Sequence, residues 1–146
     1  MNNTPFYASG LNFSCKRCSA CCRYDAGFVF LSENDLDKLT AEIKMDREGF
    51  LKTYCRWVTN MQGTESLSLK EKANNDCILW DSICTVYKAR PLQCRTFPFW
   101  KAVVDSQQSW EIAASGCPGI NSGEHHSGRA IEEYIKSRIA EPILSR

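Results

Sequence analysis

The sequence has almost no net charge, because its 146 residues carry 18 Lys and Arg against 17 Asp and Glu, a formal charge of +1. This near-equal number of positive and negative residues argues against a nucleic-acid or membrane partner recognised through bulk electrostatics. The sequence also lacks an apolar run near the ~20 residues of a membrane span. Residues 1–7 contain neither the basic nor the apolar region of a secretory signal. We therefore expect a cytoplasmic protein that binds no nucleic acid and no membrane.

The length limits the domain organisation. A chain of 146 residues forms one ordinary domain with a modest core, and it is too short for a catalytic domain plus a separate cofactor domain. Neither paired carboxylates nor a Ser/His/Asp set stands out, and the glycines form no Gly-rich strand-to-helix turn. We expect a single metal-binding domain over residues 1–146, with its core in 11–120 and no independent catalytic motif.

Nine cysteines are the exception to this ordinary composition. Disulfide frameworks belong to exported chains, whereas clustered thiols in the cytosol stay reduced and usually ligate metal or do redox chemistry. The odd number of cysteines and the missing export signal both favour metal over disulfides.

The first cysteine cluster has ligand spacing. Cys15, Cys18 and Cys21 place three thiolates within one turn of loop, which is also the spacing of the first three ligands in the bacterial ferredoxin run. Cys22 adjoins Cys21, and neighbouring side chains diverge, so one of the two is expected to serve a second site or an outer position.

Four further thiols follow on predicted loops: Cys77, Cys84, Cys94 and Cys117. The two groups of four cysteines could form two sites of four thiolates each, or one cluster with several thiols outside it. The spacing does not choose between a 4Fe-4S cluster and zinc.

Cations adjoin these cysteines, as the excess negative charge of four thiolates requires. Lys16, Arg17 and Arg23 surround the first cluster, Arg95 follows Cys94, and Arg90 lies one turn earlier. We predict that Arg90 and Arg95 donate hydrogen bonds to cysteine sulfur and so tune the site.

The remaining pattern predicts an α+β fold of short helices, small antiparallel hairpins and irregular Cys-bearing loops. Ser32 and Asp35 resemble a capping box before a helix over Glu33–Lys44, and Asp46 can cap a second short helix. Further predictions are a strand-length run at 27–31, a hairpin over 56–71, a compact turn bringing two thiols together over 77–87 and a helical turn between Pro91 and Pro98. Strand-like stretches at 99–104 and 110–114, a polar connection at 121–128 and a last helix at 129–140 complete the prediction.

Some candidate residues have simpler explanations. Cys55 shares an apolar helical face and is expected to be a buried thiol. The adjacent pair His125 and His126 is expected to be exposed rather than metal-bound. The four tryptophans are expected in the core.

Three segments together carry a family resemblance: Cys15-Lys-Arg-Cys18-Ser-Ala-Cys21-Cys22, Cys77-Ile-Leu-Trp-Asp-Ser-Ile-Cys84-Thr-Val-Tyr87 and Arg90-Pro91-Leu-Gln-Cys94-Arg95-Thr-Phe97-Pro98. They resemble the CxxCxxCC cysteine-cluster family, the YkgJ-like zinc- or iron-chelating domains. The resemblance implies a metal-chelating domain related to one found in flagellin lysine N-methylases, where an iron-sulfur cluster is implied.

Three classes of function remain open from the sequence. The favoured class is a module that binds zinc or an iron-sulfur cluster. The second is a metal-dependent redox or protein-modification enzyme or accessory, related to lysine methylation and acting on a protein substrate. The third is a structural zinc module that presents its last helix to a protein partner.

Overall fold

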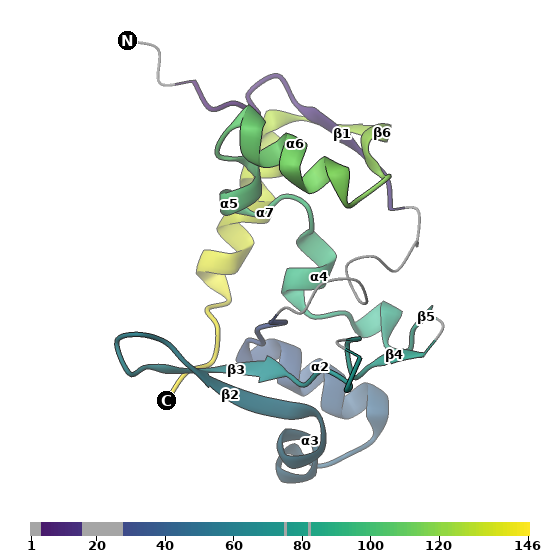
Figure 1. The fold of residues 1–146 in the computed structure, drawn as a ribbon, viewed down its shortest axis with the longest axis vertical. Helices are drawn as coiled ribbons and strands as arrows, with labels where there is room; N and C mark the ends of the chain where they lie inside the picture. The colour runs from purple at the N-terminus through teal and green to yellow at the C-terminus, as the bar shows by residue number, and fades with distance from the viewer. Residues whose placement is uncertain (1–3, 16–27, 75, 82) are drawn as a thin grey trace.

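The computed structural model describes residues 4–15, 28–74, 76–81 and 83–146 (Figure 1). Short helices alternate with two-stranded antiparallel sheets, which confirms the α+β class. The elements in chain order are β1 (Leu11–Phe13), α2 (Glu33–Ile43), α3 (Arg47–Tyr54), β2 (Cys55–Thr59), β3 (Glu65–Leu69), β4 (Trp80–Asp81), β5 (Ile83–Cys84), the 3-10 helix η1 (Tyr87–Ala89), α4 (Leu92–Thr96), α5 (Lys101–Val104), α6 (Gln107–Ser115), β6 (Ile120–His126) and α7 (Gly128–Ala140).

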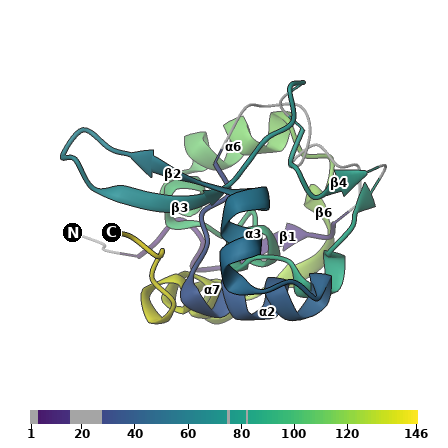
Figure 2. The same ribbon diagram turned by 90° about the horizontal axis from the view of Figure 1, so that it is seen from below.

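The buried side chains form two hydrophobic clusters. The first hydrophobic cluster lies among α2, α3 and the β2–β3 hairpin, in the lower part of Figure 1, and consists of Leu31, Leu36, Leu39, Phe50, Cys55, Leu67, Leu69, Leu79 and Val86. The second hydrophobic cluster lies in the upper part and consists of Phe99, Val104, Trp110, Ile120 and Ile131. Helix α4 lies between these two regions. The view from below in Figure 2 shows α2 and α3 in front and the β2–β3 hairpin projecting to one side.

The predicted capping box begins α2. Ser32 Oγ accepts a hydrogen bond from the Asp35 amide at 3.1 Å, and Asp35 Oδ2 accepts one from the Ser32 amide at 3.0 Å. Leu36 and Leu39 follow on the buried face of the helix. The second carboxylate oxygen of Asp35 accepts from the amide of Leu92, the first residue of α4, at 2.9 Å. One carboxylate therefore satisfies amides at the start of two helices.

The second helix and the hairpin also follow the prediction. Asp46 caps α3, whose Phe50 is fully buried in the first hydrophobic cluster. Strands β2 and β3 pair in register along their whole length, around a turn in which Gly63 takes a left-handed φ of 84°. Cys55 begins β2 instead of lying on the helix, but it is buried as predicted, with 5% of its surface exposed.

The far edge of β3 is covered by two distant segments. Of the predicted apolar run, the described residues from Phe28 to Leu31 follow this edge, where the Leu31 amide donates to the Leu67 carbonyl at 3.0 Å. The Leu67 amide donates to Leu144 at 2.9 Å, and Leu144 donates to Leu31 at 2.8 Å. The C-terminal segment therefore supplies backbone partners that the strand would otherwise lack. Gly27 lies outside the described residues.

Two predicted strands are wrong. The stretch 99–104 contains α5, and 110–114 lies within α6. Ser106 Oγ caps α6 by accepting from the Ser109 amide at 3.1 Å, and Trp110 is the residue of this helix that is buried. Ala113 and Ala114 pack beside Trp110 against the second hydrophobic cluster, but two small side chains give only a weak 3.6-residue period, so the sequence pattern does not identify the helix.

The predicted polar connection at 121–128 is also wrong, because most of it is strand β6. This strand pairs antiparallel with β1, placing His125 opposite Asn12. Gly123 has a φ of 77°, and a Cβ there would lie 2.1 Å from Ser14 Oγ, so the pairing requires a glycine. Most of the strand faces water, which removes the hydrophobic alternation that identifies strands.

Helix α7 confirms the predicted last helix within one residue. Ser127 caps it by accepting from the Ala130 amide at 3.1 Å, and Ile131 is fully buried in the second hydrophobic cluster. The helix runs from the upper region toward the lower one in Figure 1. None of the helices traced in the described ranges combines the length and hydropathy needed to cross a bilayer.

Replacing Asp35 by Ala should destabilise the fold strongly, because two helix-start amides would lose a buried acceptor. We expect the free energy of unfolding to fall by about 2–4 kcal/mol in urea denaturation. The matched control is Asp37→Ala, which removes an exposed carboxylate from the same helix and should change stability by less than about 0.5 kcal/mol. Equal losses in the two variants would contradict the role given to Asp35.

Candidate metal centre

Cys15 and Cys117 lie on neighbouring backbone segments at one end of the β1–β6 pair. The Ser14 amide donates to the Gly119 carbonyl at 3.2 Å, and a Cβ on Gly119 would lie 2.2 Å from the Ser14 carbonyl oxygen. Cys15 follows Ser14 and is exposed, whereas Cys117 precedes Gly119 by two residues and packs half-buried against the second hydrophobic cluster.

Cys77 and Cys84 flank the compact turn that the sequence predicts. Cys77 forms an isolated antiparallel bridge with Glu71, and Cys84 pairs with Trp80 across β4 and β5. The carbonyl of Leu79 closes the turn by accepting from both the amide and the hydroxyl of Thr85, at 2.9 and 2.6 Å. Both thiols are half-buried against the first hydrophobic cluster. Ser82, part of the predicted turn, lies outside the described residues.

Cys94 occupies the middle of α4, the predicted helical turn, and is half-buried. The partly buried candidate cysteines therefore come from three places: Cys77 and Cys84 from the first hydrophobic cluster, Cys117 from the second, and Cys94 from the helix between them. In both Figure 1 and Figure 2, β4 and the end of β1 lie toward the same side of the molecule.

Cys18, Cys21 and Cys22 lie outside the described residues. Within the described ranges, no three Cys, His, Asp or Glu side chains converge closely enough to hold a metal ion. The donor chemistry of Cys15, Cys77, Cys84, Cys94 and Cys117 nevertheless suits zinc or an iron-sulfur cluster, because all are sulfurs and four of the five are partly buried.

The two arginines selected from the sequence lie next to Cys94. Arg90 Nε donates to the Tyr87 carbonyl at 3.0 Å, and its guanidinium stacks 3.9 Å above the Tyr87 ring. Arg95 Nε donates to the Arg90 carbonyl at 3.0 Å. These contacts hold Arg90 against Tyr87 just before α4, and Arg95 in the last turn of α4, next to Cys94 in the chain.

Sequence reasoning missed a third cation, Arg138 on α7. Burial lowers the pKa of Arg138, while the negative charges of Asp35, Glu141 and Cys94 oppose the shift and the cation Arg95 adds to it. Arg138 Nη1 also donates to the Glu141 carbonyl at 3.2 Å. The sequence places Arg138 in the last turn of a predicted helix, where a cation is favourable. No local feature of the sequence indicates that this turn lies near Cys94.

The other candidates behave as ordinary structural residues. His125 is exposed and His126 half-buried, with ring nitrogens bonded to the Asn12 side chain at 3.0 Å and the Phe13 carbonyl at 2.9 Å. Trp110 is buried, which confirms one tryptophan of the predicted core. Trp57 and Trp100 are half-buried, so their placement is only partly internal.

Burial raises the pKa of the Cys55 thiol to about 12, with the nearby Lys70 opposing this shift. The thiol therefore remains protonated in the fold, whereas an unfolded cysteine ionises near pH ~8.5. Its contribution to the free energy of unfolding is complete below that pH and is lost as the pH rises toward 12.

In Cys55→Ala, the alkaline loss of stability that Cys55 causes should disappear. At neutral pH the variant should be about 1–2 kcal/mol less stable because it leaves a small cavity. Urea denaturation at pH 7 and pH 10, on wild type and variant together, separates the two effects. An equal alkaline loss in both proteins would show that this thiol ionises without cost.

The comparison with known families agrees with the donor chemistry. Residues 14–118 match the family CxxCxxCC, described as a "putative zinc- or iron-chelating domain". An uncharacterized protein of Methanocaldococcus jannaschii, MJ0661, is 31% identical over 146 residues, covering 94% of this chain and 71% of its own length. No solved structure matches the chain. The family match spans most of the sequence and includes every candidate cysteine ligand, and on that ground the chain belongs to the CxxCxxCC family of zinc- or iron-chelating domains.

Proposed function

We propose that this protein binds an iron-sulfur cluster, in the first instance 4Fe-4S, with zinc as the alternative metal. The proposed ligands are Cys15, Cys18, Cys21, Cys22, Cys77, Cys84, Cys94 and Cys117. The observation that carries the proposal is that Cys77, Cys84, Cys94 and Cys117 are partly buried on turns and a short helix, whereas Cys55 is part of the hydrophobic core.

The charge around Cys94 supports a thiolate site. Four thiolates leave about two excess negative charges on either zinc or an oxidised cubane. Arg90 lies just before α4, Arg95 follows Cys94 in the last turn of that helix, and Arg138 on α7 is close enough to Cys94 for their charges to interact. Arg95 and Arg138 would offset the negative charge that Cys94 carries as a metal-bound thiolate, a charge that a free thiol lacks at neutral pH.

The preference for 4Fe-4S comes from the first cysteine triplet. Cys15, Cys18 and Cys21 repeat the spacing with which ferredoxins hold three corners of a cubane, so a fourth thiolate from elsewhere in the chain completes the set. Cys94 and Cys117 are the candidates for that position. Zinc remains the alternative, because four thiolates also form a closed tetrahedral site.

Such a centre would also stabilise the fold. Cys77 and Cys84 pack against the first hydrophobic cluster, and Cys117 packs against the second. A metal bound by thiols from both clusters would hold residues 1–146 together as one domain, because the binding free energy adds to the folding free energy. We place this chemistry in the cytoplasm, where thiols stay reduced.

Substituting a proposed ligand should lower the metal content, whereas substituting the core thiol should not. We expect Cys94→Ser and Cys117→Ser, purified without oxygen, to lose most of their bound metal. Elemental analysis and the visible absorption of thiolate-bound iron measure the loss. Cys55→Ser is the matched control and should keep the wild-type metal content.

Iron with sulfide and visible absorption would establish the cluster, and colourless protein with zinc would establish the alternative. Anaerobically prepared wild type that is folded, metal-free and paired as cystines would end the proposal.

Neutralising a neighbouring cation should weaken metal binding without unfolding the chain. We expect Arg90→Gln and Arg95→Gln each to release metal to a competing chelator about tenfold faster. The control is Arg129→Gln, an exposed cation at the start of α7. Release rates equal to the control would show that these arginines serve only the backbone carbonyls that they contact.

A further inference from the structure

The segment that follows α7 connects the second hydrophobic cluster to the first. Helix α7 packs on the second cluster through Ile131. Residues 143–146 then lie along the far edge of β3, where Arg146 and Glu65 exchange two backbone hydrogen bonds of 2.9 and 3.3 Å. Figure 1 shows this path from the upper part of the molecule to the lower part. We call residues 141–146 the C-terminal clamp.

One residue of the clamp completes backbone hydrogen bonds at the edge of the core. Leu31 donates to Leu67, Leu67 donates to Leu144 and Leu144 donates to Leu31, at 3.0, 2.9 and 2.8 Å. Leu31 and Leu67 are fully buried, whereas Leu144 is half-buried. If the clamp left β3, the Leu67 N–H and the Leu31 carbonyl would lose their partner until water reached them.

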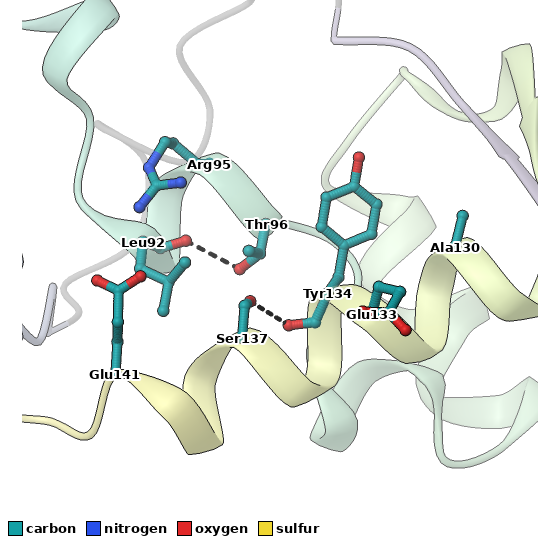
Figure 3. A pocket seen from close by; sticks show the side chains of 8 residues that line it. All are labelled: Leu92, Arg95, Thr96, Ala130, Glu133, Tyr134, Ser137 and Glu141. Atoms are coloured by element: carbon teal, nitrogen blue, oxygen red, sulfur yellow. Dashed lines mark hydrogen bonds between the residues drawn. The ribbon is translucent and has the colours of Figure 1, made fainter.

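The contact between α4 and α7 leaves space between these helices. A pocket of about 470 Å³ lies there, lined by Leu92, Arg95 and Thr96 of α4 and by side chains of α7 and its end (Figure 3). Closely packed helices interdigitate and leave few voids larger than a water molecule. The two helices therefore have room to shift relative to each other, unless a further contact fixes them.

The first residue of the clamp provides such a contact. Glu141 Oε1 accepts from Ser32 Oγ at 3.2 Å and from Asn34 Nδ2 at 3.1 Å, and both donors lie at the start of α2. Figure 3 shows Glu141 at the same end of the pocket as Arg95, the residue that follows Cys94 in the chain. The clamp is therefore attached to α2 at one end and to β3 at the other.

The side chains of the clamp add little to its attachment. The ion pair between Arg146 and Glu65 spans 3.3 Å, and both side chains are partly exposed. The Arg146 guanidinium also lies 4.2 Å from the centre of the Trp57 ring, and Ser145 is exposed. Exposed ion pairs contribute little to stability, because water and salt screen them. The clamp can thus leave β3 without unfolding either hydrophobic cluster.

The candidate ligands are divided between the two regions that the clamp connects. Cys77 and Cys84 pack against the first hydrophobic cluster, and Cys117 packs against the second. A metal held by thiolates from both clusters would fix the distance between them. The clamp restrains the same distance, because it joins α7 to α2 and β3.

Two restraints on one motion reinforce each other. The first to form bears the entropic cost of ordering the two regions, so the second closes at a higher effective concentration. The coupling is reciprocal. A docked clamp raises the affinity for metal by the same factor by which bound metal favours docking of the clamp.

We propose that the C-terminal clamp is coupled to the cysteine centre, so that bound metal favours the docked clamp and loss of metal favours its release from β3. This inference rests on the proposed cysteine centre and adds that the ligands join both regions of the fold. Docking of the clamp slows the loss of metal, and release of the clamp exposes the edge formed by Leu31 and Leu67.

Hydrogen exchange of the wild type tests the coupling, first in the metal-loaded protein and then after a chelator has removed the metal. The amides of Leu67 and Leu144 report docking of the clamp, and we expect both to exchange at least about tenfold faster without metal. The control is the amide of Gly63, which donates to the Asn60 carbonyl at 3.0 Å in the turn of the same hairpin. It should exchange equally in both states.

The outcomes separate this inference from the proposed centre. Equal exchange of the Leu144 amide in both states of a protein that binds metal would overturn the coupling and leave the cysteine centre in place. Equal acceleration at the Phe50 amide of α3 would show unfolding of the whole domain instead of release of the clamp, and would also overturn the coupling. A wild type that never holds metal would end both proposals.

A pair of variants tests the reverse direction. Leu144→Pro removes the N–H that donates to Leu31 and should release metal to a competing chelator about tenfold faster. Ser145→Pro is the matched control, because Ser145 lies opposite Ser66 in the antiparallel pairing and its amide points away from β3. Urea denaturation verifies that both variants fold. Equal release of metal by the two folded variants would refute the coupling.

Discussion

The buried carboxylate of Asp35 joins the parts of the molecule on which the candidate centre depends. One oxygen closes the capping box of α2, and the other accepts from the first amide of α4. Helix α4 has only five residues, from Leu92 to Thr96, too few for a helix to be stable by itself. Its position therefore derives from such contacts, and with it the positions of Cys94 and Arg95. The local signal that begins the first long helix thus also orients a candidate metal ligand 59 residues later in the chain.

The electrostatics near α4 follow from that placement. Arg95 and Arg138 share a partly buried region whose negative charges are Asp35, Glu141 and, when ionised, Cys94. Asp35 already accepts two amides, so its charge is partly dispersed in hydrogen bonds. Cations so close together repel one another, as the effect of Arg95 on the pKa of Arg138 shows. If Cys94 binds metal as a thiolate, it would relieve that repulsion, and the cations and the sulfur would stabilise each other.

Elements governed by local chemistry were predictable from the sequence, and elements governed by distant partners were not. Ser32 and Asp35 identified the start of α2, and the turn before β3 and the thiol-bearing turn at β4 and β5 followed from turn chemistry. Helix α6 and strand β6 were missed because each is mostly exposed, so neither shows its period in hydrophobic residues. Spacing and the family resemblance named the cysteine candidates, and their role as ligands stays a prediction. Arg138 was not, because its proximity to Cys94 arises only when α7 packs beside α4.

Helix α4 presents neighbouring side chains to different parts of the molecule. Successive residues on an α-helix point about 100° apart, so Cys94 and Arg95 face different surroundings. Arg95 lines the pocket between α4 and α7, while the charge of Cys94, a candidate ligand, acts on Arg138 of α7. A change in how α7 packs on α4 would therefore alter the charge around Cys94, because Arg95 and Arg138 lie on these two helices and both act in this region.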